Sequence, residues 1–241
     1  TGATCNTGTA AQLTWYNAIS QCAALNTVNS GAGYAGRTDW RLPTGMELET
    51  LLYLETSSPA IDAVYFPATL TDNPYWSSSA SASSAATAWL VSFYAAPSLP
   101  DNKSNAYYIR CVSGASVGSV TSFSNQPEDT VLDTRTNLLW EKCSNGLSGT
   151  NCATGISTPL SWANAIAYCE NLTRASQSDW RLPTKNELMS IVDRTKDSPS
   201  INTTAFPATS PNSFWSSTTY AASIGLAWSV YFTYGGSGGD G

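Results

Sequence analysis

The first recurring pattern along the chain is an apolar stripe at helical spacing. Residues 13–26 carry apolar side chains every three or four positions, at Trp15, Ile19, Cys22 and Leu25. This spacing predicts an amphipathic helix, with Thr14 placed to cap its N-terminus. The pattern returns later in the chain at Ser161, Trp162, Ile166, Cys169 and Leu172. We therefore expect the same helix twice.

A second helix is predicted directly after the hexapeptide Asp-Trp-Arg-Leu-Pro-Thr, which occurs at residues 39–44 and again at residues 179–184. Thr44 with Glu47, and Thr184 with Glu187, have the spacing of a capping box, in which Thr and Glu satisfy each other's backbone donors. The apolar positions that follow predict the buried face: Leu48, Leu51 and Leu52 in the first copy, and Leu188, Ile191 and Val192 in the second.

Beyond this helix the apolar residues alternate, as they do in strands. Trp89, Val91 and Phe93 fall on one face, and so do Trp228, Val230 and Phe232. Residues 107–112 predict another short strand, and residues 131–140 a strand pair whose turn is Asp133–Asn137. Each copy is thus expected to have an α+β fold, with two helices, a small twisted antiparallel sheet and long loops.

These patterns belong to one repeat that occurs twice. Trp15 and Trp162 are 147 positions apart, whereas the two hexapeptides are 140 apart, so one loop near residues 29–36 is seven residues longer in the first copy. A repeat of this length indicates two tandem domains rather than a solenoid. We expect a first domain over residues 1–115, a linker over 116–128 and a second domain over 129–241.

The two copies are incomplete in complementary ways. The second copy opens with Thr130–Cys143, which has no counterpart in the first, and the first closes with Tyr108–Val112, which has none in the second. A domain without such a strand exposes backbone groups and part of its core. Two explanations stay open. Either the chain is a piece of a longer protein, or neighbouring subunits supply the strands head to tail and build a filament.

Six cysteines, two Met and no His indicate an oxidising compartment and disulfides rather than metal. Cys22, on a predicted helix, and Cys111, on the closing strand of the same copy, form the first expected pair. Cys143 and Cys152 enclose a short loop and form the second.

Cys5 and Cys169 are left over. Cys169 corresponds to Cys22, so its partner is expected on a closing strand that the second copy lacks. One hypothesis is that the segment around Cys5 of a neighbouring subunit provides that strand and an intersubunit disulfide. The alternative is a pair of free thiols.

Composition and charge point to a secreted protein. Only 12% of residues are charged, where about a quarter is typical of soluble domains. The net charge of −6 is evenly divided: residues 1–115 have four Lys and Arg against seven Asp and Glu, and residues 116–241 have seven against ten. This balance argues against nucleic acid as a partner. No apolar run approaches the ~20 residues of a membrane span. The chain begins without Met, as a mature or trimmed extracellular product would.

Nothing in the sequence indicates catalysis. The lack of His removes the Ser-His-Asp and Cys-His schemes and the usual zinc sites. The acidic residues show no paired-carboxylate spacing. We expect no enzyme activity, no catalytic or metal-binding residues and no cofactor.

The hexapeptide residues are expected to be structural. Trp40 and Trp180 could stack on sugars, but anchoring a loop is the favoured role. Arg41 and Arg181 could bind an anion, but a bidentate bond to Glu47 and Glu187 is favoured. Asp39 and Asp179 complete the motif. If there is a ligand, it should lie on the variable loops: Asn29–Arg37, Ser79–Thr87, Ala95–Ser104 and Thr219–Gly225.

The series Trp-x-x-Ala-x-x-x-Cys, Asp-Trp-Arg-Leu-Pro-Thr-x-x-Glu-Leu, Phe-Pro, Trp-Ser-Ser, Ala-Trp-x-Val-x-Phe and Arg-Cys-Val resembles the Lcl C-terminal domain family, named from a bacterial collagen-like adhesin. The resemblance covers nearly the whole chain, twice. It implies C-type-lectin-like domains whose first helix is tied by a disulfide to the last strand, and Cys22–Cys111 fits that tie. It also implies an extracellular bacterial protein that attaches to host glycans, including sulfated ones.

The chain departs from calcium-dependent lectins, because Trp76 and Trp215 are followed by Ser-Ser and Gln126-Pro-Glu128 lies in the linker. Related formylglycine-generating enzymes need a reactive cysteine pair, whereas these cysteines are better explained as disulfides. We expect a secreted bacterial cell-surface or matrix protein without membrane insertion. It would assemble head to tail with copies of itself, or act as a monomeric adhesin-type module that binds glycan or a host or matrix protein through its loops.

Overall fold

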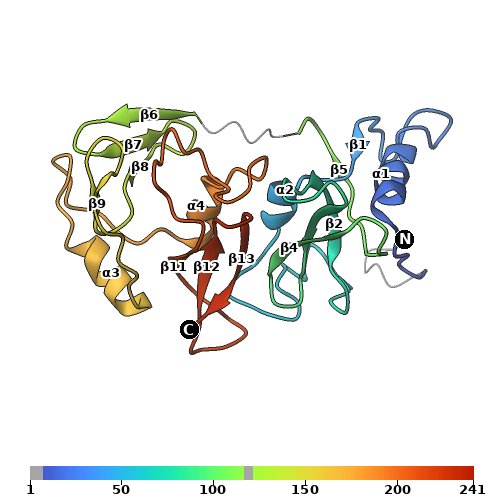
Figure 1. The fold of residues 1–241 in the computed structure, drawn as a ribbon. Helices are drawn as coiled ribbons and strands as arrows, with labels where there is room; N and C mark the ends of the chain where they lie inside the picture. Colours follow the sequence, from blue (N-terminus) through green and yellow to red (C-terminus); the bar gives the residue numbers. More distant parts are fainter. Residues whose placement is uncertain (1–7, 117–121) are drawn as a thin grey trace. The chain divides into compact units, whose positions relative to one another are not determined.

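The structure is a computed structural model that describes residues 8–116 and 122–241 (Figure 1). It contains two compact units, one comprising Thr1–Gly118 and the other comprising Ser119–Thr219 and Ile224–Gly241. Each unit combines two short helices with small antiparallel sheets. The α+β class and the tandem arrangement agree with the sequence.

The first domain contains α1 (Trp15–Ala24), β1 (Trp40–Arg41), α2 (Gly45–Glu49), β2 (Tyr75–Ala80), β3 (Thr87–Val91), β4 (Ser98–Asn102) and β5 (Val112–Ser113). β3 lies between β2 and β4, antiparallel to both. β5 pairs with β1, which brings the end of the domain back to the hexapeptide.

The second domain begins with a three-stranded sheet of β6 (Phe123–Gln126), β7 (Thr130–Asp133) and β8 (Leu138–Glu141), followed by the β9 (Leu147–Ser148) and β10 (Thr154–Gly155) pair. It continues with α3 (Trp162–Glu170), α4 (Lys185–Ser190), β11 (Ser213–Thr219), β12 (Ala227–Tyr231) and β13 (Gly236–Asp240). β12 lies between β11 and β13, as β3 lies between its neighbours.

Both capping boxes form as predicted, at Thr44 and at Thr184. The helices they start are shorter than expected, so Leu52, Ile191 and Val192 come after the helix ends, although all three are buried. Leu51 is only half-buried. Leu52 and Val192 each donate to the carbonyl three residues earlier and also form a bridge, to Ile61 and Ile201 respectively.

The predicted buried face of the first helix is partly wrong. Ile19 is 36% exposed, and the residues with no exposure are Ala18 and Cys22. Small side chains at these two positions let α1 approach β2 closely, so the buried stripe is narrower than the apolar pattern suggested.

The burial of residues in the strands does not follow the alternating pattern that the sequence predicted. Trp89 and Val91 are buried as predicted, but so are Ala88 and Leu90, because β3 is covered on both faces. Phe93 and Phe232 are buried beyond the ends of their strands.

Two segments that the sequence predicted to be irregular form strands in the structure. β6 lies inside the predicted linker, and β4 lies inside the predicted loop Ala95–Ser104. The Gly-rich end of the chain, which shows no strand pattern, forms β13 against β12. The Tyr231 ring packs against this strand, since a Cβ on Gly238 would lie 2.4 Å from the Tyr231 hydroxyl oxygen. Pairing with a buried central strand overrides low strand propensity at this position.

Candidate functional site

The cysteines divide as the sequence predicted. Cys22 on α1 is bonded to Cys111, and Cys143 is bonded to Cys152. Within residues 8–116 and 122–241, Cys169 on α3 is the cysteine without a disulfide. Cys5 lies outside the described residues, so the Cys5–Cys169 pairing stays a hypothesis.

The hexapeptide arginines are bound to helix caps, as predicted. The two terminal nitrogens of Arg41 lie 2.7 and 2.6 Å from the Glu47 carboxylate oxygens, and those of Arg181 lie 2.7 and 2.6 Å from Glu187. Each carboxylate also accepts the backbone N–H of its capping Thr at 2.8 Å. Hydrogen bonding to Arg181 lowers the pKa of Glu187 to about 2.

The tryptophans and serines of the repeat also have structural partners. The Trp40 and Trp180 indoles donate to the loop carbonyls of Tyr34 and Arg174, at 2.9 and 3.2 Å. In Trp-Ser-Ser, the Ser77 hydroxyl donates to the Trp89 carbonyl, and Ser216 does the same to Trp228. These groups anchor loops to strands and are not arranged around a ligand.

The clearest difference between the domains is the segment that closes the first one, residues 107–114, which we call the closing segment. Tyr107 exchanges two backbone hydrogen bonds with Leu13, at 2.8 and 3.0 Å. Tyr108 accepts from the Trp76 N–H at 2.9 Å and donates to the Pro74 carbonyl at 3.1 Å. The segment thereby fills the space beside β2.

The end of the closing segment binds the hexapeptide. Val112 and Ser113 form β5 against β1, and the Gly114 carbonyl accepts the Arg41 Nε–H at 2.9 Å. The Ser113 hydroxyl donates to Asp39, and Cys111 is bonded to α1. One short segment thus joins α1, β2 and the hexapeptide.

The second domain has counterparts of the positions that contact this segment, with Ser213 and Phe214 in place of Pro74 and Tyr75, but has no such segment among its described residues. We define its acceptor edge as the counterpart positions: Leu160, Cys169, Trp180–Leu182 and Ser213–Trp215. β11 is the outer strand of its three-stranded group, and no bridge from residues 8–116 or 122–241 matches Leu13–Tyr107, Tyr75–Tyr108 or the β1–β5 pair.

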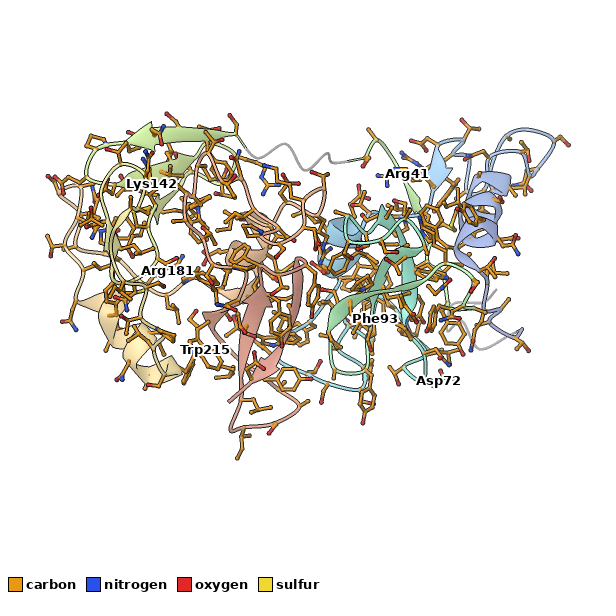
Figure 2. The ribbon with its side chains drawn as sticks, in the orientation of Figure 1. Arg41, Asp72, Phe93, Lys142, Arg181 and Trp215 are labelled. Carbon is orange, nitrogen blue, oxygen red and sulfur yellow. A yellow bond between two sulfur atoms is a disulfide. The ribbon has the colours of Figure 1, made fainter. Side chains whose placement is uncertain are left out.

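The acceptor edge is correspondingly more exposed. Trp76, Leu42 and Cys22 are buried in the first domain, whereas Trp215, Leu182 and Cys169 are only half-buried. The Arg41 side chain is 26% exposed, and its counterpart Arg181 is 54% exposed. Arg181 and Trp215 are labelled in Figure 2, as is Arg41 in the first domain.

The free thiol lies beside an acidic cluster. The Glu141 carboxylate accepts from the Tyr168 hydroxyl at 2.8 Å and lies 3.4 Å from the Arg174 guanidinium. Burial, together with Glu141 and Glu170, raises the pKa of Cys169 to about 11. The thiol is therefore protonated at neutral pH, which makes it slow to react by itself.

Two of the predicted ligand loops lie together in the first domain, where the Lys103 backbone N–H and Nζ donate to the Ala86 and Ala85 carbonyls at 2.9 and 2.7 Å. The first domain also has an open pocket, outside these loops, of about 340 Å³ and lined by Thr71, Asp72, Asn73, Pro74, Ser92 and Tyr94. Asp72 is labelled in Figure 2. The residues come from two segments far apart in the sequence, so no local motif could have revealed them.

Each helix in the described part of the chain is too short or too polar to cross a membrane. In the same part of the chain, no three Cys, Asp or Glu side chains form a group that could hold a metal ion.

No curated protein and no solved structure matches the chain. The family comparison does give a match, and it covers both domains. The Lcl C-terminal domain model matches residues 2–113 and again residues 129–241. The chain therefore belongs to the Lcl C-terminal domain family and contains that domain twice.

Proposed function

We propose that this protein acts by assembly, as a head-to-tail subunit of an extracellular filament. The observation that carries the proposal is the contrast between the two copies. The first has a closing segment bonded through Cys111, and the second has counterparts of the positions that contact that segment, together with the free thiol of Cys169.

A strand from another copy of the chain would supply hydrogen-bond partners for the backbone groups of the acceptor edge. The bond we propose joins Cys169 of one subunit to Cys5 of the next, with a disulfide-forming oxidant taking up the two electrons and two protons. The donor and acceptor surfaces differ, so the contact is heterologous and repeats without closing. Strand addition of this kind derives its affinity from main-chain hydrogen bonds.

Finer features of the proposal concern the fold and its location. We infer C-type-lectin-like domains related to a collagen-like adhesin, because the Cys22–Cys111 disulfide ties the first helix to the closing segment. A secreted or cell-surface location is supported by the two disulfides and by the low content of charged residues, 12%.

A second candidate function is a monomeric adhesin-type module. The pocket at Asp72, Asn73, Ser92 and Tyr94 favours it, since Tyr94 is 58% exposed beside polar side chains. An exposed aromatic ring with carboxylate, amide and hydroxyl groups suits a polar ligand such as a glycan. The two functions are compatible, because a filament could carry such pockets.

Non-reducing electrophoresis tests the assembly. Purified full-length chain incubated with oxidised glutathione should give a ladder of covalent oligomers that collapses on reduction, and electron microscopy should show fibres. Cys169→Ser and Cys5→Ser should each abolish the ladder, while the Cys22–Cys111 disulfide stays intact in both variants. A wild-type protein that stays monomeric at high concentration would contradict the proposal.

A further inference from the structure

We propose that the acceptor edge is a strand-binding site with a fixed direction and a side-chain code, and that its occupant is an extended, cysteine-containing segment of a second copy of the chain. The inference deepens the proposed function and rests on it for the source of the strand. The closing segment of the first domain serves as the template.

The template sets the direction of the bound strand. Tyr108 bridges Tyr75 in the parallel sense, whereas Val112 and Ser113 pair antiparallel with Arg41 and Trp40. The bound strand therefore runs first parallel to β11 at Phe214 and then antiparallel along Trp180–Arg181. Its backbone hydrogen-bonds to three separate elements, which excludes the reverse orientation.

Side chains of the template alternate, as in any strand. Tyr107, Ile109 and Cys111 face the core formed by Ala18, Leu42 and Trp76, and the Tyr107 ring meets the Trp76 ring edge-on with centroids 5.2 Å apart. The second domain presents the same surface through Ala165, Leu182 and Trp215. The code is thus two large apolar residues and a cysteine at alternate positions.

A segment near the start of the chain matches the end of this code. Cys5-Asn-Thr-Gly8 repeats the spacing of Cys111-Val-Ser-Gly114, with a hydroxyl residue and a glycine at the same distances from the cysteine. In the template, Ser113 and Gly114 bind Asp39 and Arg41. Their counterparts Asp179 and Arg181 are exposed. Arg181 would gain the acceptor for its Nε–H that Arg41 already has.

A peptide with the sequence of residues 105–115 tests the site directly, using the full chain with Cys5→Ser so that no second copy competes. The peptide cysteine is activated as a mixed disulfide with 2-thiopyridine. The Cys169 sulfur attacks the peptide sulfur, a new S–S bond forms as the old one breaks, and 2-thiopyridone leaves with the proton. Mass spectrometry of the product should place the peptide on Cys169.

Backbone methylation separates strand docking from simple thiol reactivity. The Tyr108 N–H of the template donates to Pro74, whereas the Ile109 N–H has no backbone partner in the described chain. N-methylation at the Tyr108 position should slow capture at least about tenfold, since that factor corresponds to losing one good contact. N-methylation at the Ile109 position is the matched control and should leave the rate within about twofold of the parent.

Two results would overturn the inference: equal rates for both methylated peptides, or capture of a scrambled peptide as fast as the parent. A covalent ladder from the wild-type chain together with either result would leave assembly standing and remove the strand code. Selective capture without any ladder would establish the site and instead remove the assembly.

Discussion

At the scale of single residues, the two copies show how one side-chain pair is used twice. Arg41–Glu47 and Arg181–Glu187 have the same geometry, and in both the carboxylate caps the following helix. An arginine in a repeated hexapeptide suggests anion binding, but here the guanidinium is occupied by the cap. The two arginines differ in two respects: the Arg41 Nε–H donates to Gly114 of the closing segment, and the Arg181 side chain is more exposed, at 54% against 26%.

The Glu187 carboxylate predicts a pH dependence of stability. Its folded pKa is lowered from 4.5 to about 2, so its contribution is present above pH 4.5 and is lost as the pH falls towards 2. Glu187→Gln should lower the free energy of unfolding at pH 7 by about 1 kcal/mol, a small value because Arg181 is exposed. It should also flatten the dependence of stability on pH below 4.5, measured by urea titration.

Glu170→Gln is the matched control, because Glu170 is an exposed carboxylate at the end of α3 and has no ion pair among the described residues. Glu170→Gln should leave the dependence of stability on pH below 4.5 unchanged. The same result for Glu187→Gln would contradict the assignment of this dependence to Glu187.

At the scale of elements, the closing segment stabilises the first domain by joining distant parts of the chain. Its disulfide links cysteines 89 residues apart, whereas Cys143–Cys152 links cysteines only 9 apart. Crosslinking restricts the unfolded chain more when the loop is longer.

The double variant Cys22→Ser/Cys111→Ser should therefore destabilise the first domain by about 4 kcal/mol, and Cys143→Ser/Cys152→Ser the second by less than about 3 kcal/mol. Both losses in the free energy of unfolding can be measured by denaturant titration, with proteolytic cleavage in each domain used to follow the unfolding of that domain. A larger loss from the short loop would show that geometry, not loop length, sets the contribution.

At the scale of the whole molecule, each unit has its own core and should unfold separately. The first is built around Trp76, Leu90 and Cys22, the second around Trp140, Phe206 and Val230. We expect two calorimetric transitions in the monomer.

Assembly should raise the midpoint temperature of only one of these two transitions. Binding to the folded state stabilises a domain by mass action. The transition temperature of the second domain should therefore rise in oxidised oligomers and fall back on selective reduction. The transition temperature of the first domain should not change. Both transitions moving together would contradict strand docking at the acceptor edge.

Much of the fold and of the residue contacts could be predicted from the sequence. The doubled hexapeptide, the capping Thr and Glu, and the paired tryptophans act through neighbours a few residues away, and local spacing is visible in sequence. The disulfide Cys22–Cys111 was predicted from the places of the two cysteines on a helix and on the closing strand of one copy, and Cys143–Cys152 from the short loop they enclose. β4, β6 and β13 could not be predicted, because residues such as Gly236–Asp240 form strands only when a neighbouring strand supplies the hydrogen bonds.

The sequence alone predicted that one α+β domain occurs twice and that Cys169 corresponds to Cys22. Only the tertiary structure showed which groups border the acceptor edge: the Trp215 side of β11, the Trp180–Arg181 backbone and the thiol on α3. The physical reason is that helix caps and periodicities are short-range properties of the chain, whereas an unpaired edge exists only after distant segments have packed and left it exposed.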